Sequence, residues 1–267
     1  MRPSRAIPTD SRHPALREHA QAPAEPAIPE FLVRSACRLG PVPAVTEVRL
    51  HLADDALALW QRTEDACGAG QPPPYWAFAW PGGQVLARYV LDHRDVVRGR
   101  TVLDLGSGSG LVAIAAQLAG AAAVLASEID ALAVAAIRLN ALANGVPVPA
   151  IVGDILAGDA LADKARASAQ DGAEVVVAGD VWYSRPLAER VLGFLERAAA
   201  GGALVLLGDI GRAFLPRDRL RVLDARDIPV VAELEDAAVK QAMVWTLRSP
   251  RGDLGHRTAP GRPARFR

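Results

Sequence analysis

Apolar residues follow two alternating periods through the middle of the chain. Short runs rich in Val, Leu and Ile predict buried strands at residues 101–105, 123–129, 149–155, 174–180 and 203–209. Segments between them carry apolar residues at helical spacing and close in a glycine, at residues 110–120, 130–145 and 184–202. Short strands that alternate with helices predict a parallel sheet with helices on both faces.

The segments that flank this pattern change its character. Residues 220–234 and 241–248 contain strand-like runs without a convincing helix between them, which predicts an antiparallel C-terminal edge hairpin. Before the sheet, residues 43–65 begin with strand-like alternation and then turn helical, so we expect residues 31–100 to form an N-terminal cap. The predicted fold class is α/β, a Rossmann-like seven-stranded mostly parallel sheet, with its core in residues 101–248.

Composition narrows the class of protein. The 267 residues are 51% hydrophobic with a formal net charge of zero, so no overall field attracts nucleic acid or an anionic membrane. No apolar run approaches the ~20 residues of a membrane helix. Cys37 and Cys67 have no neighbours at metal-ligand spacing, so we expect free thiols and no metal site. We expect a cytoplasmic monomer with disordered ends at residues 1–30 and 249–267.

The stretch "VLDLGSGSG" (102–110) carries the first candidate chemistry. Gly106, Gly108 and Gly110 follow a predicted strand, at the sheet edge where open α/β proteins bind ligands. A dinucleotide site needs the spacing G-x-G-x-x-G, which this loop lacks. Asp104 would repel a pyrophosphate but suits a cationic ligand such as S-adenosylmethionine, through an amino group or a bound water.

Acids at the next strand ends extend this interpretation. Glu128 is placed to accept the two hydroxyls of a ribose, and Ile129 to cover one face of an adenine. Asp154 is placed to accept a hydrogen bond from the adenine amino group. Ser107, in the glycine loop, and Ile155, beside Asp154, complete this set of candidate cofactor residues. Asp130 is expected to cap the following helix instead.

These motifs resemble those of a known enzyme family. "VLDLGSGSG", "ASEID" (126–130) and "IVGDIL" (151–156) are similar to motifs of class I S-adenosylmethionine-dependent methyltransferases. The stretches "WAFAWPGGQ" (76–84), "DVWY" (180–183), "LLGDIGRAFLP" (206–216) and "VWTLR" (244–248) resemble the lysine methyltransferases that act on the β subunit of electron transfer flavoprotein. The resemblance implies S-adenosylmethionine as cofactor and that β subunit as protein substrate.

The tetrapeptide 180–183 follows the fourth predicted strand, where a methyl acceptor would arrive. A lysine amine with a pKa near ~10.4 must lose its proton before it can attack, and Asp180 is a candidate to accept its N–H and aim the nitrogen. Asp180 therefore belongs to both the catalytic and the cofactor set. Trp182 and Tyr183 are expected to wall the lysine channel, with core packing as the alternative for Trp182.

The segment 76–84 is expected to run extended with its aromatic residues on one face, then turn before a helix that begins near Gln84. The resemblance implies that Trp80, Gly82 and Gln84 cover the methionine part of the cofactor. Core packing is the alternative for the aromatic residues of this segment.

Other function classes fit less well. A nucleic-acid methyltransferase commonly shows two prolines after strand four, which "DVWY" lacks, and a non-enzymatic module would have lost the loop glycines. Ser107 and Ser109 lack the G-x-S-x-G context of a hydrolase. His51 and His93 have no acid or nucleophile in a recognisable arrangement, so we expect structural roles. A methyltransferase that acts on another protein, such as a ribosomal one, or on a small-molecule amine remains the main alternative.

Overall fold

The computed structural model describes residues 28–157, 172–230 and 235–248 of the chain. The disorder expected at both ends concerns residues outside this part, apart from residues 28–30, which begin helix α1. The elements before the main sheet are α1 (Ile28–Ala36), β1 (Arg38–Val42), β2 (Val45–Leu52), α2 (Ala56–Cys67), the 3-10 turns η1 (Tyr75–Ala77) and η2 (Arg94–Val96), and α3 (Pro81–Asp92). None of the helices in the described ranges is long and apolar enough to cross a membrane.

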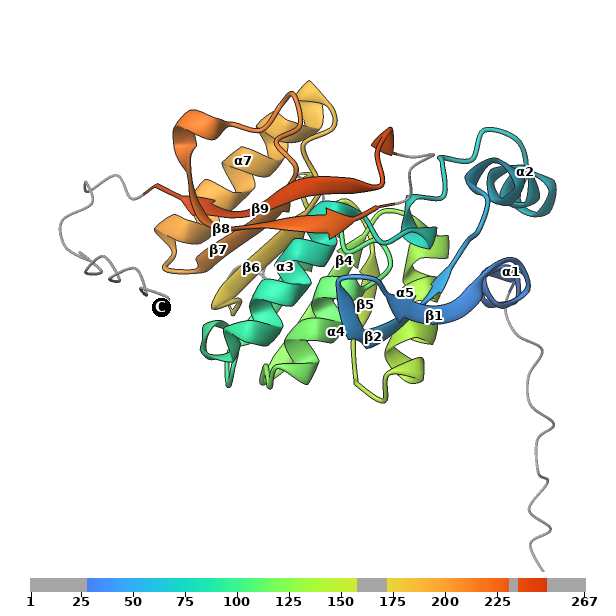
Figure 1. Cartoon of the computed structure of the whole chain (residues 1–267), viewed down its shortest axis with the longest axis horizontal. Coiled ribbons are helices and arrows are strands. Elements are labelled where there is room, and N and C mark those ends of the chain that lie inside the picture. The colour runs from blue at the N-terminus through green and yellow to red at the C-terminus, as the bar shows by residue number, and fades with distance from the viewer. Residues whose placement is uncertain (1–27, 158–171, 231–234, 249–267) are drawn as a thin grey trace, which may run out of the picture.

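A seven-stranded sheet forms the centre of the molecule, in the order β5-β4-β3-β6-β7-β9-β8 (Figure 1). Its parallel strands are β3 (Thr101–Leu105), β4 (Ala123–Glu128), β5 (Ala150–Val152), β6 (Val175–Gly179) and β7 (Leu204–Asp209). The antiparallel edge is formed by β8 (Leu220–Pro229) and β9 (Val239–Leu247). The predicted fold class and its edge hairpin are therefore confirmed. The strand order reverses between β3 and β6, so this fold binds ligands at the carboxyl ends of these two strands.

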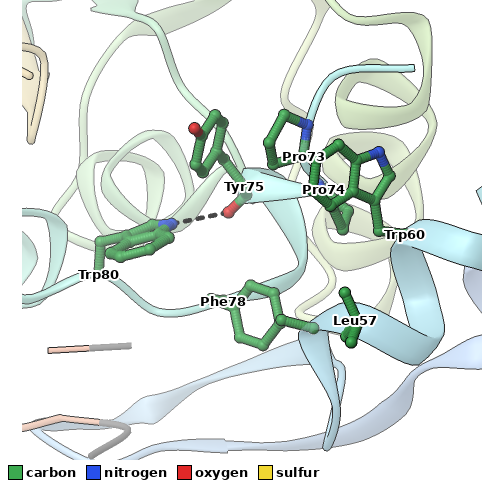
Figure 2. Close-up of a pocket in the computed structure, with 8 residues that line it drawn as sticks. Leu57, Trp60, Pro73, Pro74, Tyr75, Phe78 and Trp80 are labelled. Carbon is green, nitrogen blue, oxygen red and sulfur yellow. Dashed lines mark hydrogen bonds between the residues drawn. The ribbon is translucent and has the colours of Figure 1, made fainter. Parts of the chain in front are cut away.

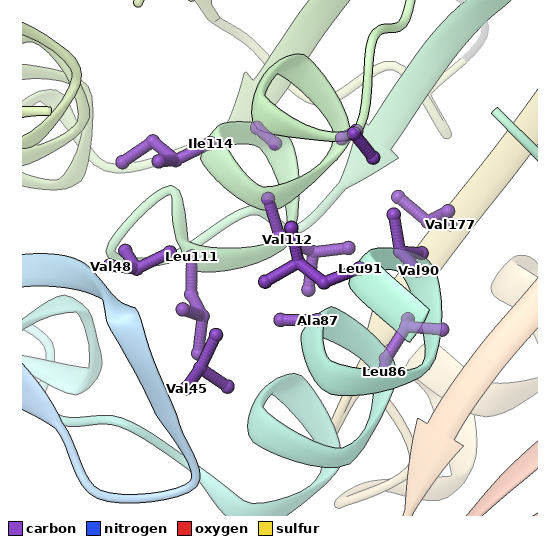
Figure 3. Close-up of a cluster of buried hydrophobic side chains, with 14 of the residues drawn as sticks. Val45, Val48, Leu86, Ala87, Val90, Leu91, Leu111, Val112, Ile114 and Val177 are labelled. Atoms are coloured by element: carbon purple, nitrogen blue, oxygen red, sulfur yellow. The ribbon is translucent and has the colours of Figure 1, made fainter. Parts of the chain in front are cut away.

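Helices cover both faces because the buried strands alternate their side chains between two cores. Helices α3, α4 (Leu111–Leu118) and α5 (Ala131–Ala143) lie on one face, and α7 (Arg185–Ala200) covers the other. In the first core, Val177 of β6 packs with Val90 of α3 and Val112 of α4 (Figure 3). Its neighbours Val176 and Ala178 belong to the second core, with Phe194 of α7.

The N-terminal segment lies over the helices rather than over the sheet. The hairpin β1-β2 turns Val45 and Val48 toward α3 and α4, where Leu111 packs with them (Figure 3). Helix α1, α2 and η1 form a third apolar cluster with α5. This segment thus holds α3, α4 and α5, the three helices that start at the ligand-binding edge of the sheet.

The start of α3 corrects two expectations from the sequence. Trp76 lies in η1 instead of an extended segment, and α3 begins at Pro81, three residues before Gln84. Pro81 occupies the first helical position, where its missing N–H costs no hydrogen bond. Gly82 and Gly83 therefore belong to the first turn of a helix, which points its amide groups at the sheet edge.

Candidate active site

The glycine loop joins β3 to α4 and lies open at the edge of the sheet. Gly106 and Gly108 have φ values of 64° and 54°, a left-handed conformation that favours glycine. Two backbone hydrogen bonds hold the loop to β4: Gly106 N and Ser107 N both donate to Ser127 O, at 3.0 and 3.2 Å. A Cβ added to Gly108 would meet nothing within 4 Å, so a ligand can lie directly against this backbone.

Asp104 braces this loop from beneath. Its side chain is buried, and its Oδ2 accepts hydrogen bonds from Ser107 Oγ at 2.5 Å and from Ala113 N at 3.0 Å. Burial raises the pKa of Asp104 to about 7, against the two hydrogen bonds that lower it. Asp104 and the Ser107 hydroxyl thus hold each other and the start of α4 through Asp104 Oδ2, and the contact of Asp104 and Ser107 with the ligand stays a prediction.

Glu128, at the end of β4, is the acid that borders the open side of the loop. Its Oε1 accepts from Gly108 N at 2.7 Å and its Oε2 from Ile129 N at 2.9 Å. Each carboxylate oxygen has a further lone pair, so the group can still receive hydroxyl donors. Ile129 is 70% exposed, so its apolar side chain is free to pack against a flat ring such as adenine. The prediction of a ribose and adenine site at this strand end stays in agreement with the geometry.

Removal of the Glu128 carboxylate should weaken cofactor binding. We expect Glu128→Ala to raise the Kd for S-adenosylhomocysteine, measured by calorimetry, at least about tenfold, since hydrogen bonds to a charged group contribute roughly 1.5–3 kcal/mol. Glu189→Ala, which removes an exposed carboxylate from α7, is the matched control. Equal affinity for the two variants would contradict the assignment.

The third strand end differs more from the sequence prediction. Strand β5 ends at Val152 because Asp154 starts a turn, in which its Oδ1 accepts from Leu156 N at 2.9 Å. Its Oδ2 accepts from Arg190 Nη2 of α7 at 2.5 Å. The Ile155 side chain is buried in the core with Leu103, so it does not face a ligand, and a cofactor contact by the backbone of this residue stays a prediction. Asp154 therefore lies just after the end of β5, as expected, but forms an ion pair with Arg190.

Asp180 stands at the end of β6, opposite the first turn of α3. Its Oδ2 accepts from Gly83 N at 2.8 Å, and its backbone adopts a φ of 56°, which is uncommon for a residue other than glycine. Burial, and after it the charge of Asp209, raise the pKa of Asp180 to about 7. Strained backbone and a carboxyl that titrates near neutral pH are both features of functional sites.

The contact between α3 and the sheet depends on residues without a Cβ. A Cβ on Gly82 would lie 2.3 Å from Gly208 O of β7, and one on Gly179 would lie 3.0 Å from Gly83 N. Gly82 therefore serves the close approach of helix and sheet, and its contact with the cofactor stays a prediction. The same approach places Gly83 N–H on Asp180.

Gln84 braces the cap rather than facing the loop. Its Oε1 accepts from Ala44 N at 3.1 Å, and its Nε2 donates to Ala79 O at 2.7 Å and to Pro229 O at 3.2 Å. The side chain is 1% exposed, and the protein occupies its donors and acceptor. The predicted contact of Gln84 with the cofactor is therefore wrong.

The rings of Trp80, Tyr75 and Tyr183 form a group of aromatic contacts, and Arg212 lies between the Trp80 ring and Asp180. Trp80 donates from Nε1 to Tyr75 O at 2.8 Å, and Figure 2 shows the two residues at the edge of an apolar pocket that Leu57, Trp60 and Phe78 also line. The Tyr75 ring lies 6.1 Å from that of Tyr183, which is 58% exposed. The place of Tyr183 at a substrate channel stays a prediction, and the sequence did not point to Tyr75 as its ring partner.

Trp182, by contrast, belongs to the core. It is 0% exposed and packs with Val176 and Phe194 beneath the sheet edge. The chain bends at Tyr183, so the two neighbouring side chains differ in exposure, 0% for Trp182 and 58% for Tyr183. The prediction that Trp182 lines a lysine channel is wrong, and the core-packing alternative is confirmed.

A buried polar chain connects the N-terminal hairpin to the glycine loop. Asn140 of α5 accepts from His51 N at 2.8 Å, and its Nδ2 donates to Ser109 O at 2.8 Å. The His51 ring lies 2.8 Å from the same Asn140 oxygen, through Nδ1. The structural role expected for His51 is confirmed, and Asp130 caps α5 as predicted, by accepting from Leu132 N at 2.8 Å.

Comparison with known proteins agrees with this geometry. Residues 85–206 match the profile of a family described as ribosomal protein L11 methyltransferase (PrmA). The chain is 36% identical over 206 residues to the electron transfer flavoprotein beta subunit lysine methyltransferase of Mus musculus, covering 74% of this chain and 76% of that protein. It is 38% identical over 190 residues to the human protein of the same name, covering 70% and 68%.

The chain is 40% identical over 168 residues to the Rattus norvegicus protein of this name. That match covers 62% of this chain and spans 61% of the relative's length. Together with the glycine loop, these relatives identify the cofactor as S-adenosylmethionine. The chain is a class I S-adenosylmethionine-dependent methyltransferase that belongs to the family of electron transfer flavoprotein beta subunit lysine methyltransferases.

Proposed function

We propose that this protein methylates lysine side chains of the electron transfer flavoprotein β subunit. The observation that carries the proposal is the Asp180 carboxyl, which follows β6 beside the strand of the glycine loop and is held by Gly83 N–H. Tyr183 lies three residues further along the chain, is exposed and contacts the ring of Tyr75. An acid next to aromatic faces suits a long apolar stem that ends in a cation. The substrate itself is inferred from the relatives, which carry that activity in their names.

The residues at the carboxyl ends of β3 and β4 fit the cofactor. The open backbone of Gly108 would lie against it, beside Gly106, whose positive φ turns the loop. Glu128 would receive its ribose hydroxyls, and exposed Ile129 would cover its adenine. When bound there, S-adenosylmethionine supplies an electrophilic methyl group on a sulfonium.

Asp180 handles the acceptor in this proposal. A lysine amine is mostly protonated at neutral pH, and the neutral form is the nucleophile. The Asp180 carboxylate accepts an N–H of the amine and aims its lone pair, while the proton leaves to water. Tyr183 and Tyr75 enclose the aliphatic stem, which partly removes water and favours the neutral amine. Alignment of nitrogen, methyl carbon and sulfur then supplies much of the rate.

The substrate is tested by labelling. Purified protein is incubated with isotope-labelled S-adenosylmethionine and a lysate of its source organism, and labelled proteins are identified by mass spectrometry. We expect methylated lysine on the electron transfer flavoprotein β subunit. Label on a ribosomal protein would instead make that protein the substrate, as the match to the ribosomal protein L11 methyltransferase family would favour. Label on small metabolites alone would overturn the protein-lysine assignment.

A further inference from the structure

Arg212, in the loop after β7, lies at the centre of an acidic cluster that adjoins Asp180. Its Nη2 is 3.3 Å from Asp180 Oδ1 and 2.7 Å from Glu235 Oε1. The loop itself is fixed by Asp209, whose Oδ1 accepts from Arg212 N at 2.7 Å and from Gly211 N at 2.6 Å. One guanidinium thus faces three carboxyl groups from three parts of the chain.

The cluster is shielded from water. The exposed fractions of the side chains are 23% for Arg212, 10% for Asp180 and 7% for Glu235. The guanidinium carbon lies 5.8 Å from the centre of the Trp80 ring, a cation–π distance. Glu235 and Trp80 therefore hold Arg212 from two sides, and the same guanidinium also contacts Asp180.

The charge of Asp180 is the quantity that this arrangement controls. Burial and Asp209 favour the neutral acid, whereas Arg212 and Gly83 N–H favour the carboxylate, and Glu235 faces Asp180 through the guanidinium. These opposing influences leave the pKa of Asp180 at about 7. Arg212 is the single cation among them, so its loss would leave Asp180 neutral over much of the physiological range.

We propose that Arg212 is a positioning residue for methyl transfer: clamped by Glu235 and the Trp80 ring, it keeps the Asp180 carboxylate charged and in place at the acceptor side. The inference rests on the proposed function, because a neutral Asp180 would accept the N–H of a lysine amine more weakly than the carboxylate does. A purely structural Arg212, which ties the loop after β7 to Glu235, would change stability and rate without changing how the rate depends on pH.

The test compares Arg212→Gln, which removes the charge, with Arg212→Lys, which retains it. Arg219→Gln is the matched control, since Arg219 forms an exposed ion pair with Glu196 elsewhere on the surface. We expect Arg212→Gln to move the acid limb of kcat/KM upward by at least about one pH unit. For a pKa that rises from about 7 by one unit, this is about a fivefold loss at pH 7, which shrinks toward pH 9. The limbs of Arg212→Lys and Arg219→Gln should stay within about half a unit of the wild type.

A second measurement needs no methyl acceptor. In protein labelled with 13C at aspartate carboxyls and saturated with S-adenosylhomocysteine, the Asp180 resonance is assigned by its loss in Asp180→Asn. We expect it to titrate at least about one unit higher in Arg212→Gln than in the wild type. An unchanged titration, or a uniform rate loss with an unmoved limb, would overturn the inference. A wild-type protein that methylates no lysine would instead overturn the proposed function, and the resonance would still report on Arg212.

Discussion

Replacement of Gly208 by alanine is expected to destabilise the protein by about 3 kcal/mol or more and to remove its activity. A Cβ at this position would lie 1.9 Å from Gly82 O, 2.7 Å from Gly82 C and 2.9 Å from Leu86 Cβ. The first two are backbone atoms of α3, which cannot rotate away as the end of a side chain can. Overpacking of this kind typically costs 1–3 kcal/mol and displaces backbone, so α3 would have to move off the sheet.

Denaturant unfolding of Gly208→Ala, followed by circular dichroism, measures the loss. Gly193→Ala in α7 is the matched control, because its Cβ would meet only the flexible end of Arg197, at 3.4 Å. That variant should be as stable as the wild type or up to about 1 kcal/mol more stable, since alanine favours a helix interior. Wild-type stability in Gly208→Ala would show that α3 and β7 lie farther apart than the structure places them.

The contact at Gly208 links stability to chemistry. Helix α3 reaches the ends of β6 and β7 because Gly82, Gly179 and Gly208 have no side chains, and this approach brings Gly83 N–H to 2.8 Å from Asp180. A shift of one ångström would break that hydrogen bond. The catalytic geometry therefore depends on close backbone packing more than on the side chains of α3.

Much of the fold was predictable because its strands are buried on both faces and read as continuous apolar runs. The elements that were missed have weak local signals. Strand β1 contains Gly40 and Pro41, which disfavour strands, and forms through its pairing with β2. Helix α3 was started too late because Pro81 and two glycines are typical of a turn, and their use in a first helical turn depends on a contact with distant Gly208.

The site was predictable as far as topology determines it. Parallel strands end at one edge, so Glu128 and Asp180 had to meet the glycine loop there. Orientation was not predictable: Trp182 and Gln84 lie at the expected positions but turn inward to partners far along the chain. Arg212 and Glu235 were missed for the same reason, since 23 residues separate them and their ion pair exists only in the folded structure.

Substitution of Asp180 is the second change with a large expected effect. We expect Asp180→Ala and Asp180→Asn to lower kcat for lysine methylation at least about 100-fold, since proton handling by a positioned side chain contributes roughly 10²–10⁴. The asparagine variant keeps the shape and tolerates the φ of 56°, so loss of charge is its main change. The Kd for S-adenosylhomocysteine, measured by calorimetry, should rise by less than about tenfold, because Glu128 and the glycine loop hold the cofactor.

The control for this prediction is Asp218→Asn. It removes an exposed carboxylate from a 3-10 turn that follows β7 and should leave kcat unchanged. A kcat in Asp180→Asn above about one tenth of the wild-type value would remove Asp180 from the acceptor step. Loss of cofactor affinity in parallel with kcat would assign Asp180 to cofactor binding instead. A fall in kcat with retained affinity is the result that the contact between Gly83 and Asp180 predicts, because that contact aims the carboxylate at the acceptor and leaves the glycine loop as it was.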